Sequence, residues 1–170
     1  MLDVINKRFS AREYTDKQVD DELLEKVLIA AQLSPTWKNK QCFEIICIDN
    51  KDLQLEIGEL ANFNPSESAY KKASHLLVFI ADPTKSGLRD DKPYYMCDSA
   101  IAIEHSILEA TSLGLGTCWV GVFPEQKIKN ILHIPEHLRI VAMTPLGYTS
   151  ESFQKRPRRE IKEIVHWNKY

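Results

Sequence analysis

The chain has 170 residues, of which 44% are hydrophobic and 27% charged, with six glycines and eight prolines. This composition is typical of one globular domain and excludes a disordered or collagen-like chain. Lysines and arginines number 22 against 24 acidic residues, and the resulting net charge of -2 excludes a surface built as a whole to bind nucleic acid.

We expect the protein to be cytoplasmic and to enter no membrane. Residues 1–10 lack the apolar core of a signal peptide, and no apolar run approaches the roughly 20 residues that a helix needs to span a bilayer. The four cysteines form no CxxC pair and lie in apolar stretches, where a thiol packs as a small hydrophobic group. Disulfides and zinc are therefore both disfavoured, and no metal site is predicted.

Helices and strands alternate in the first half of the chain. After a short N-terminal helix, residues 22–33 carry apolar side chains at helical spacing behind an acidic first turn. The Ile-rich residues 43–49 predict a buried strand, residues 51–62 a helix, and residues 75–82 a second buried strand.

The second half begins with a loop at residues 84–93. A long apolar-rich segment follows at 94–113 and predicts a central helix packed on several sides. Residues 117–123 and 138–148 predict two further strands, with a short helix at 125–132 between them. Helices and strands mixed in this order predict one α+β domain, in which helices cover a sheet.

Positive charge gathers at the two ends of the chain. Residues 1–12 carry three basic residues against one acidic residue, and residues 154–170 carry six against two, so the remainder holds a net charge of -8. If the fold brings the two ends together, as domain termini often are, they form an anion site. The alternative is a pair of solvated basic tails.

Each end holds a short arginine-rich element. Arg8 and Arg12 flank Ser10 near the start, and Arg156 and Arg158 stand close together near the end. Arginine matches phosphate geometry through a rigid fork of donors, and a serine hydroxyl adds another donor. The alternative for the first pair is ordinary surface salt bridges.

Two further segments have the composition of ligand-binding loops. In the polar loop after residue 34, the amides of Asn39 and Gln41 each offer a donor and an acceptor, which suits the edge of a heterocycle. The alternative is that they satisfy only backbone groups. Residues 114–121 hold three glycines that let backbone approach a ligand, but they lack the GxGxxG spacing of a dinucleotide fold.

Taken together, in this order, four segments resemble the nitroreductase family of FMN-dependent oxidoreductases. They are the Arg-x-Ser-x-Arg element at 8–12, the polar loop at 35–43, the Gly-Leu-Gly-Thr-x-Trp-x-Gly run at 114–121, and the late basic element before residues 163–167. The resemblance covers essentially the whole chain.

The resemblance implies a fold and an assembly. The fold is α+β, with a mixed, mainly antiparallel sheet flanked by helices, and residues 1–170 form a single FMN-binding domain. The assembly is a homodimer with FMN at the subunit interface. Its C-terminal arm, residues 154–170, is exchanged between the two subunits.

The resemblance also implies which residues bind FMN. The arginines and Ser10 bind the phosphate and ribityl chain, and Asn39 binds the flavin ring. The backbone of Val120 and Gly121 lies near the reactive N5 and O4 edge, and the two residues before them border one face of the ring. No catalytic side chain is implied, because the flavin carries the chemistry. The full set is Arg8, Phe9, Ser10, Arg12, Pro35, Thr36, Asn39, Cys118, Trp119, Val120, Gly121, Arg156 and Arg158.

The implied activity is oxidoreduction by a ping-pong mechanism. Electrons pass from NADH or NADPH through FMN to a nitro compound, a quinone or a similar small electrophile. Neither nucleic acid nor membrane is an expected partner. The alternative is a non-catalytic flavin-binding or carrier protein, which would keep the arginines but lack an open ring face.

Overall fold

The computed structural model describes residues 1–154 and 156–170; Lys155, inside the predicted C-terminal arm, lies outside the described residues. Its α-helices are α1 (Leu2–Lys7), α2 (Asp21–Gln32), α3 (Lys51–Leu60), α4 (Glu67–Lys71), α5 (Tyr94–Ser112) and α6 (Glu125–Ile131). Its strands are β1 (Phe43–Ile48), β2 (His75–Ala81), β3 (Leu88–Arg89), β4 (Lys92–Pro93), β5 (Gly116–Thr117) and β6 (Arg139–Gly147). Short 3-10 helices lie at Trp37–Asn39 and Ile161–Glu163.

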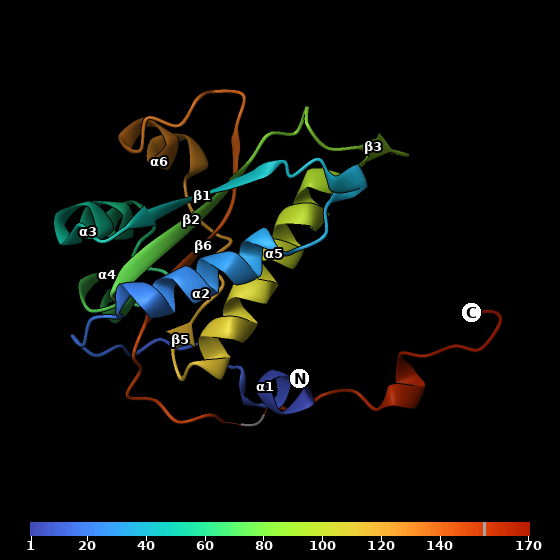
Figure 1. The fold of residues 1–170 in the computed structure, drawn as a ribbon, viewed down its shortest axis with the longest axis horizontal. Helices are drawn as coiled ribbons and strands as arrows, with labels where there is room; N and C mark the ends of the chain where they lie inside the picture. Colours follow the sequence, from blue (N-terminus) through green and yellow to red (C-terminus); the bar gives the residue numbers. More distant parts are fainter. Residues whose placement is uncertain (155) are drawn as a thin grey trace.

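The core is a four-stranded sheet in the order β1-β2-β6-β5, with every neighbouring pair antiparallel (Figure 1). The buried strands predicted at 43–49 and 75–82 are therefore confirmed as β1 and β2, and they pair with Phe43 opposite Ala81. The α+β class with a mainly antiparallel sheet is also confirmed.

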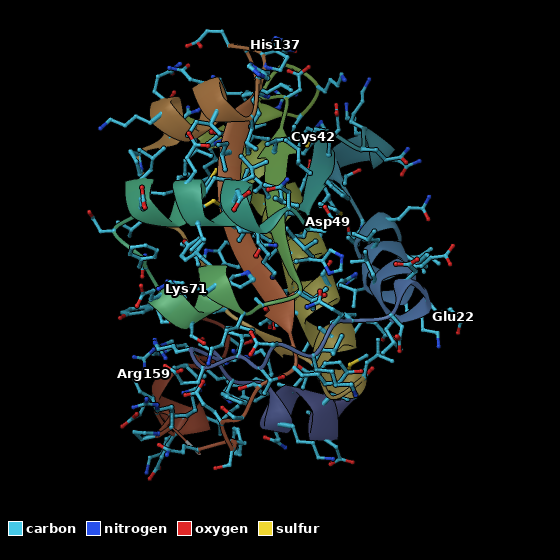
Figure 2. The ribbon with its side chains drawn as sticks, turned by 90° about the vertical axis from the view of Figure 1, so that its left-hand side faces the viewer. Glu22, Cys42, Asp49, Lys71, His137 and Arg159 are labelled. Carbon is cyan, nitrogen blue, oxygen red and sulfur yellow. The ribbon has the colours of Figure 1, made fainter. Side chains whose placement is uncertain are left out.

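Helices cover both faces of the sheet, as the side view in Figure 2 shows. Successive side chains of a strand point to opposite faces, so β2 contributes to two separate cores. Leu76 and Val78 pack with α3, α4 and α6 on one face, whereas Leu77 and Phe79 pack with α2 and α5 on the other. All four side chains are fully buried, which explains the continuous apolar run in this strand.

Helix α5 is the central helix predicted at 94–113. Its 19 residues span about 28 Å at the usual rise of an α-helix. Its buried face, which includes Ala102 and Ile103, packs between α2 and the sheet. Its C-terminal end leads into β5 and lies beside α1 (Figure 1).

Two segments differ from the prediction. The strand expected at 117–123 is wrong in extent: only Gly116–Thr117 pairs with β6 as a strand, and Val120 forms an isolated bridge to Met143. The other side of Thr117 is taken by Ser10, so this short strand joins the N-terminal segment to the sheet. The loop expected at 84–93 contains the hairpin β3-β4, whose two turn residues both have positive φ, as a two-residue hairpin turn requires.

The segment after β6 leaves the sheet and ends far from it. Figure 1 shows residues 156–170 extending past α1 and away from the helices and the sheet. Its apolar side chains are exposed, and Trp167 shows 85% of its surface to solvent. These exposed side chains are Ile161, Ile164, Val165, Trp167 and Tyr170.

The position of Gly116 gives a testable consequence for the fold. A Cβ at Gly116 would lie 2.9 Å from the Ala11 Cβ and 3.0 Å from the Thr149 Cβ. We expect Gly116→Ala to lower the free energy of unfolding by about 1–3 kcal/mol, because both neighbours belong to packed backbone segments. Urea denaturation followed by circular dichroism measures this change.

Gly121→Ala is the matched control. Its Cβ would come within 3.4 Å only of the Trp119 ring, at 3.3 Å, and that side chain is 41% exposed and free to shift. Its effect should stay within about 0.5 kcal/mol. Equal losses in the two variants would contradict the packing role of Gly116.

Candidate functional site

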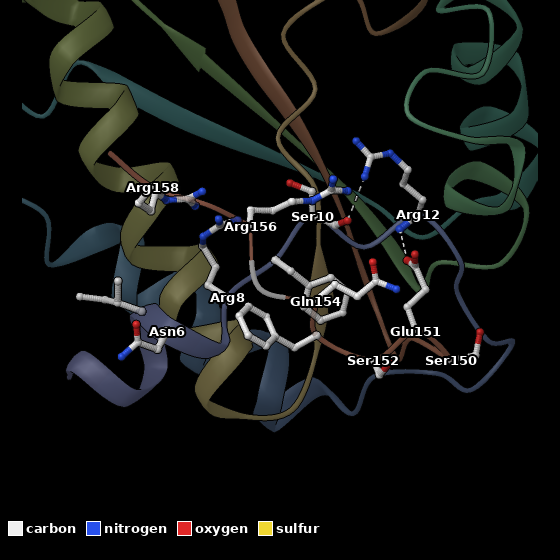
Figure 3. A pocket seen from close by; sticks show the side chains of 13 residues that line it. Asn6, Arg8, Ser10, Arg12, Ser150, Glu151, Ser152, Gln154, Arg156 and Arg158 are labelled. Atoms are coloured by element: carbon white, nitrogen blue, oxygen red, sulfur yellow. Dashed lines mark hydrogen bonds between the residues drawn. The ribbon is translucent and has the colours of Figure 1, made fainter. Parts of the chain in front are cut away.

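The two ends of the chain meet at one cavity of about 820 Å³ (Figure 3). The arginine-rich elements predicted at either end both line it, so the alternative of two separate solvated tails is wrong. The lining residues are Ile5, Asn6, Arg8, Phe9, Ser10, Arg12, Ser150, Glu151, Ser152, Phe153, Gln154, Arg156 and Arg158.

Backbone pairing explains why these ends meet. The N–H of Ala11 donates to the Thr117 carbonyl over 2.9 Å, and the N–H of Thr15 donates to the Tyr148 carbonyl over the same distance. The segment around residues 10–15 therefore lies between β5 and the chain that follows β6. The Glu151 carboxylate then accepts the backbone N–H groups of Arg12 and Glu13, which ties the C-terminal side of the cavity to its N-terminal side.

The four guanidinium groups of the cavity have no carboxylate partner among residues 1–154 and 156–170. Within the described residues, the Arg12 guanidinium donates only to the Ser10 carbonyl, over 3.3 Å, and that of Arg158 only to its neighbouring Pro157 carbonyl, over 3.2 Å. In Figure 3 the side chains of Arg8 and Arg156 lie on one side of Ser10 and that of Arg12 on the other. The alternative of ordinary salt bridges for Arg8 and Arg12 is thus wrong, and the cavity offers charged donors suited to a phosphate.

Cys118 lies next to Ser10, but none of the predicted residues 118–121 lines this cavity. Burial raises the pKa of the Cys118 thiol, and it outweighs the lowering influence of the Arg12 guanidinium and the Ser10 hydroxyl. The thiol therefore stays neutral near pH 7 and acts as a packing group rather than a nucleophile.

Only one of the two backbone donors expected here is free. The Val120 N–H donates to the Met143 carbonyl over 2.9 Å and the Val120 carbonyl accepts the Met143 N–H, so both backbone groups of Val120 are used by the sheet. The Gly121 N–H donates to no group of the described residues. A ligand beside this segment is left with Gly121 as its backbone donor.

The polar loop after α2 holds three non-glycine residues with positive φ: Lys38 at 47°, Asn39 at 54° and Gln41 at 49°. Such strained backbone clusters at functional sites and persists only where the surroundings enforce it. The Thr36 hydroxyl accepts the Gln41 N–H, and the Gln41 amide donates to the Asn39 carbonyl. The Asn39 side chain forms no hydrogen bond within the described part of the chain, so its amide remains available to a ligand.

A single chain does not bring this loop to the arginine cavity. The Trp37 N–H donates to Asp98 over 2.8 Å, and the Trp37 ring packs on Tyr94, which places the loop at the N-terminal end of α5. The cavity lies beyond the C-terminal end of that helix. From Asp98 to Ser112 the helix rises about 21 Å. Pro35, Thr36 and Asn39 are therefore separated from the predicted phosphate-binding residues.

Sequence reasoning missed the cavity residues around Glu151. Phe153 packs edge-on against Phe9, with ring centroids 6.4 Å apart, and forms an apolar side of the cavity. The sequence feature that could have indicated these residues is their position directly before the basic element at Arg156. Among the described residues, no group of three or more His, Cys, Asp or Glu side chains is placed to hold a metal ion.

Cys42 gives a pH-dependent prediction for the polar loop. Its thiol donates to Asp98 over 3.4 Å, and burial together with that hydrogen bond raises the pKa of Cys42 from 9.0 to about 11. The neutral thiol therefore stabilises the fold fully below pH 9, and this contribution is lost as the pH rises toward 11. Cys42→Ser keeps a donor that does not titrate in this range. Its free energy of unfolding should fall less than that of the wild type between about pH 8 and about pH 10.5. Equal falls in urea denaturation would contradict the assignment.

Comparison with known proteins identifies the family of this chain. A model of the nitroreductase family matches residues 5–148. A relative from Archaeoglobus fulgidus, provisionally named an NADH dehydrogenase/NAD(P)H nitroreductase, is 30% identical over 99% of this chain and 98% of its own length. The FMN reductase (NADPH) of Bacillus subtilis is 26% identical over 98% of this chain and 72% of its own length. The crystal structure of a nitroreductase family protein from Clostridium difficile superimposes on this chain with a TM-score of 0.89 and 29% identity. The superposition covers all of this chain and 99% of that protein's chain.

None of the helices in the described part of the chain combines the length and the apolar character that crossing a bilayer requires. The family match spans most of the chain, from within α1 to the residue after β6, and includes the first arginine-rich element but not the second. The chain belongs to the nitroreductase family.

Proposed function

We propose that the arginine cavity binds the phosphate of FMN and that the protein is an NAD(P)H-dependent FMN oxidoreductase. The observation that carries this proposal is the set of four guanidinium groups that surround one cavity without a carboxylate partner among the described residues. A dianionic phosphate would supply the missing negative charge. Membership of the nitroreductase family, with relatives named for FMN and NADPH, supports FMN as the molecule that carries this phosphate.

The residues present fit this cofactor. Arg8, Arg12, Arg156 and Arg158 would hold the phosphate together with the Ser10 hydroxyl, since each presents donors at the cavity. The two phenylalanine rings of the cavity add an apolar wall beside these donors. When bound, FMN supplies the redox chemistry by accepting a hydride from NAD(P)H and passing its electrons to an acceptor.

The other half of the site would come from a second copy of the chain. Asn39 has a free carboxamide suited to the edge of a flavin ring, yet it lies at the far end of α5. We propose a homodimer in which Asn39, with Pro35 and Thr36 of the same loop, faces the ring bound beside Gly121 of the partner copy. Residues 1–170 would then act as one FMN-binding domain that is complete only as a dimer.

Exposed apolar surface supports the same assembly. On α5, Met96, Cys97 and Ile101 are exposed although they lie on a helix that is otherwise packed. The C-terminal arm also exposes its apolar side chains and has no contact surface of its own to bury them. Association of two copies would bury both surfaces, and the arm, residues 154–170, would wrap over the partner.

The acceptor would be a small electrophile such as a nitro compound or a quinone. With Cys118 and Trp119 bordering one face of the flavin ring, the other face is left for NAD(P)H and the acceptor in turn. The described residues contain no long insertion near the polar loop. Each strand of the neighbouring hairpin β3-β4 has only two residues. The four free cysteines suit the reducing environment of the cytoplasm, where NAD(P)H is supplied.

Removal of single arginines tests the phosphate assignment. Arg8→Ala and Arg158→Ala should each weaken FMN binding about tenfold or more, because a charged hydrogen bond is worth about 1.5–3 kcal/mol. Titration of the apoprotein followed by flavin fluorescence measures the affinity. Arg159→Ala is the matched control, since Arg159 belongs to the same segment and does not line the cavity. Unchanged affinity in both cavity variants would refute the assignment.

Steady-state kinetics test the use of one open ring face. Double-reciprocal plots against NAD(P)H at several acceptor concentrations should be parallel, and the oxidised acceptor should compete with NAD(P)H. Mixing with NAD(P)H alone without oxygen should bleach the flavin, and a quinone should restore its colour. Intersecting lines would require a second site. Failure of both NADH and NADPH to bleach the flavin would favour a flavin carrier.

A further inference from the structure

Asp98 is a buried carboxylate with an unusual set of partners. It lies in the N-terminal part of α5 with 4% of its surface exposed. One oxygen accepts the Trp37 N–H over 2.8 Å, and the other accepts the Cys42 thiol over 3.4 Å and the Ser86 hydroxyl over 2.8 Å. No lysine, arginine or histidine of the described residues pairs with it. Three neutral donors from outside α5 therefore compensate its desolvation.

Two of these donors stand at the two ends of the strained loop. Trp37 precedes the residues with positive φ and Cys42 follows them, so Asp98 ties the start of this stretch to its end. Lys38, Asn39 and Gln41 have no glycine-like freedom, and backbone of this kind relaxes unless its surroundings hold it. Because α5 is rigid and packed on the sheet, a carboxylate fixed on it is suited to hold both ends.

The third donor links Asp98 to a neighbouring segment. Ser86 lies directly before Gly87, where a Cβ would come within 2.5 Å of the Trp37 ring. The Tyr94 ring packs on Trp37 from the α5 side, with centroids 4.5 Å apart. Trp37 is thus held by both its backbone and its ring.

We propose that Asp98 is a positioning residue that holds Asn39 ready to meet the flavin ring. The inference rests on the proposed FMN function and adds a residue that contacts no part of the cofactor. The Asp98 carboxylate fixes the loop ends, the loop keeps its strained backbone, and the Asn39 amide is presented without a partner of its own. A side chain with a single acceptor oxygen cannot hold Trp37 and Cys42 in this way.

The test measures FMN affinity and the midpoint potential of the bound flavin in the full-length protein. Asp98→Ala should weaken FMN binding about tenfold and shift the potential in the same direction as Asn39→Ala. If Asp98 acts through Asn39, the two effects are not additive, so Asp98→Ala should change the affinity by less than about threefold in the Asn39→Ala background. Asp98→Asn keeps one acceptor oxygen and should restore part of the affinity, and it replaces Asp98→Ala if that variant does not fold.

Ser106→Ala is the matched control. Ser106 is equally buried on α5, and its hydroxyl donates to the Val27 carbonyl over 3.2 Å, so the variant loses a hydrogen bond from the same helix without touching the loop. Its FMN affinity should stay within about twofold of the wild type.

The outcomes separate the two proposals. Wild-type affinity and potential in both Asp98 variants, or fully additive effects with Asn39→Ala, would overturn the role of Asp98. Absence of FMN binding in the wild type would overturn the proposed function instead. Normal affinity and potential in Asn39→Ala would overturn both the ring contact and the positioning role, and would leave the arginine cavity standing.

Discussion

The continuous helix α5 is the constraint on which the rest of the site depends. A hydrogen-bonded helix does not shorten, so the rise of about 21 Å from Asp98 to Ser112 keeps the polar loop at one end of α5 apart from the cavity at its other end. Under the proposed function, each chain thus carries two half-sites that do not meet within the chain. In a two-fold dimer, each contact between a residue of one copy and a different residue of the other copy occurs twice, once in each direction. Two copies would therefore complete two sites at once.

Both half-sites hold features that are unfavourable in the chain alone. At one end, four guanidinium groups gather around a cavity without a carboxylate partner in the described residues. At the other end, Lys38, Asn39 and Gln41 adopt backbone angles that most residues avoid. Stability given up in this way is typical of binding sites, and a bound ligand offsets it by favouring the folded state.

Sequence patterns predicted the helices and strands that form by burying apolar side chains. They also predicted candidate site residues whose side-chain chemistry suits a ligand. The run in β2 and the spacing in α5 were readable because both are packed on several sides. Arg8 and Arg158 were identified because arginine suits phosphate. The short extent of β5 was not predictable, since the chain leaves the ladder after Thr117 and returns to β6 only at the isolated bridge of Val120 to Met143. Asp98 was missed because two of its partners, Trp37 and Cys42, lie in the polar loop, 61 and 56 residues earlier in the sequence.

A mixture of two defective chains tests the divided site most directly. One chain carries Arg8→Ala with Arg158→Ala, the other carries Asn39→Ala, and each has a different affinity tag so that heterodimers can be isolated after co-expression. A site shared between copies leaves each heterodimer with one intact site and one doubly altered site. We predict that both homodimers bind FMN more weakly than the wild type and that half of the sites of the heterodimer bind FMN with wild-type affinity. A heterodimer in which every site is weakened would show that each site lies within one chain.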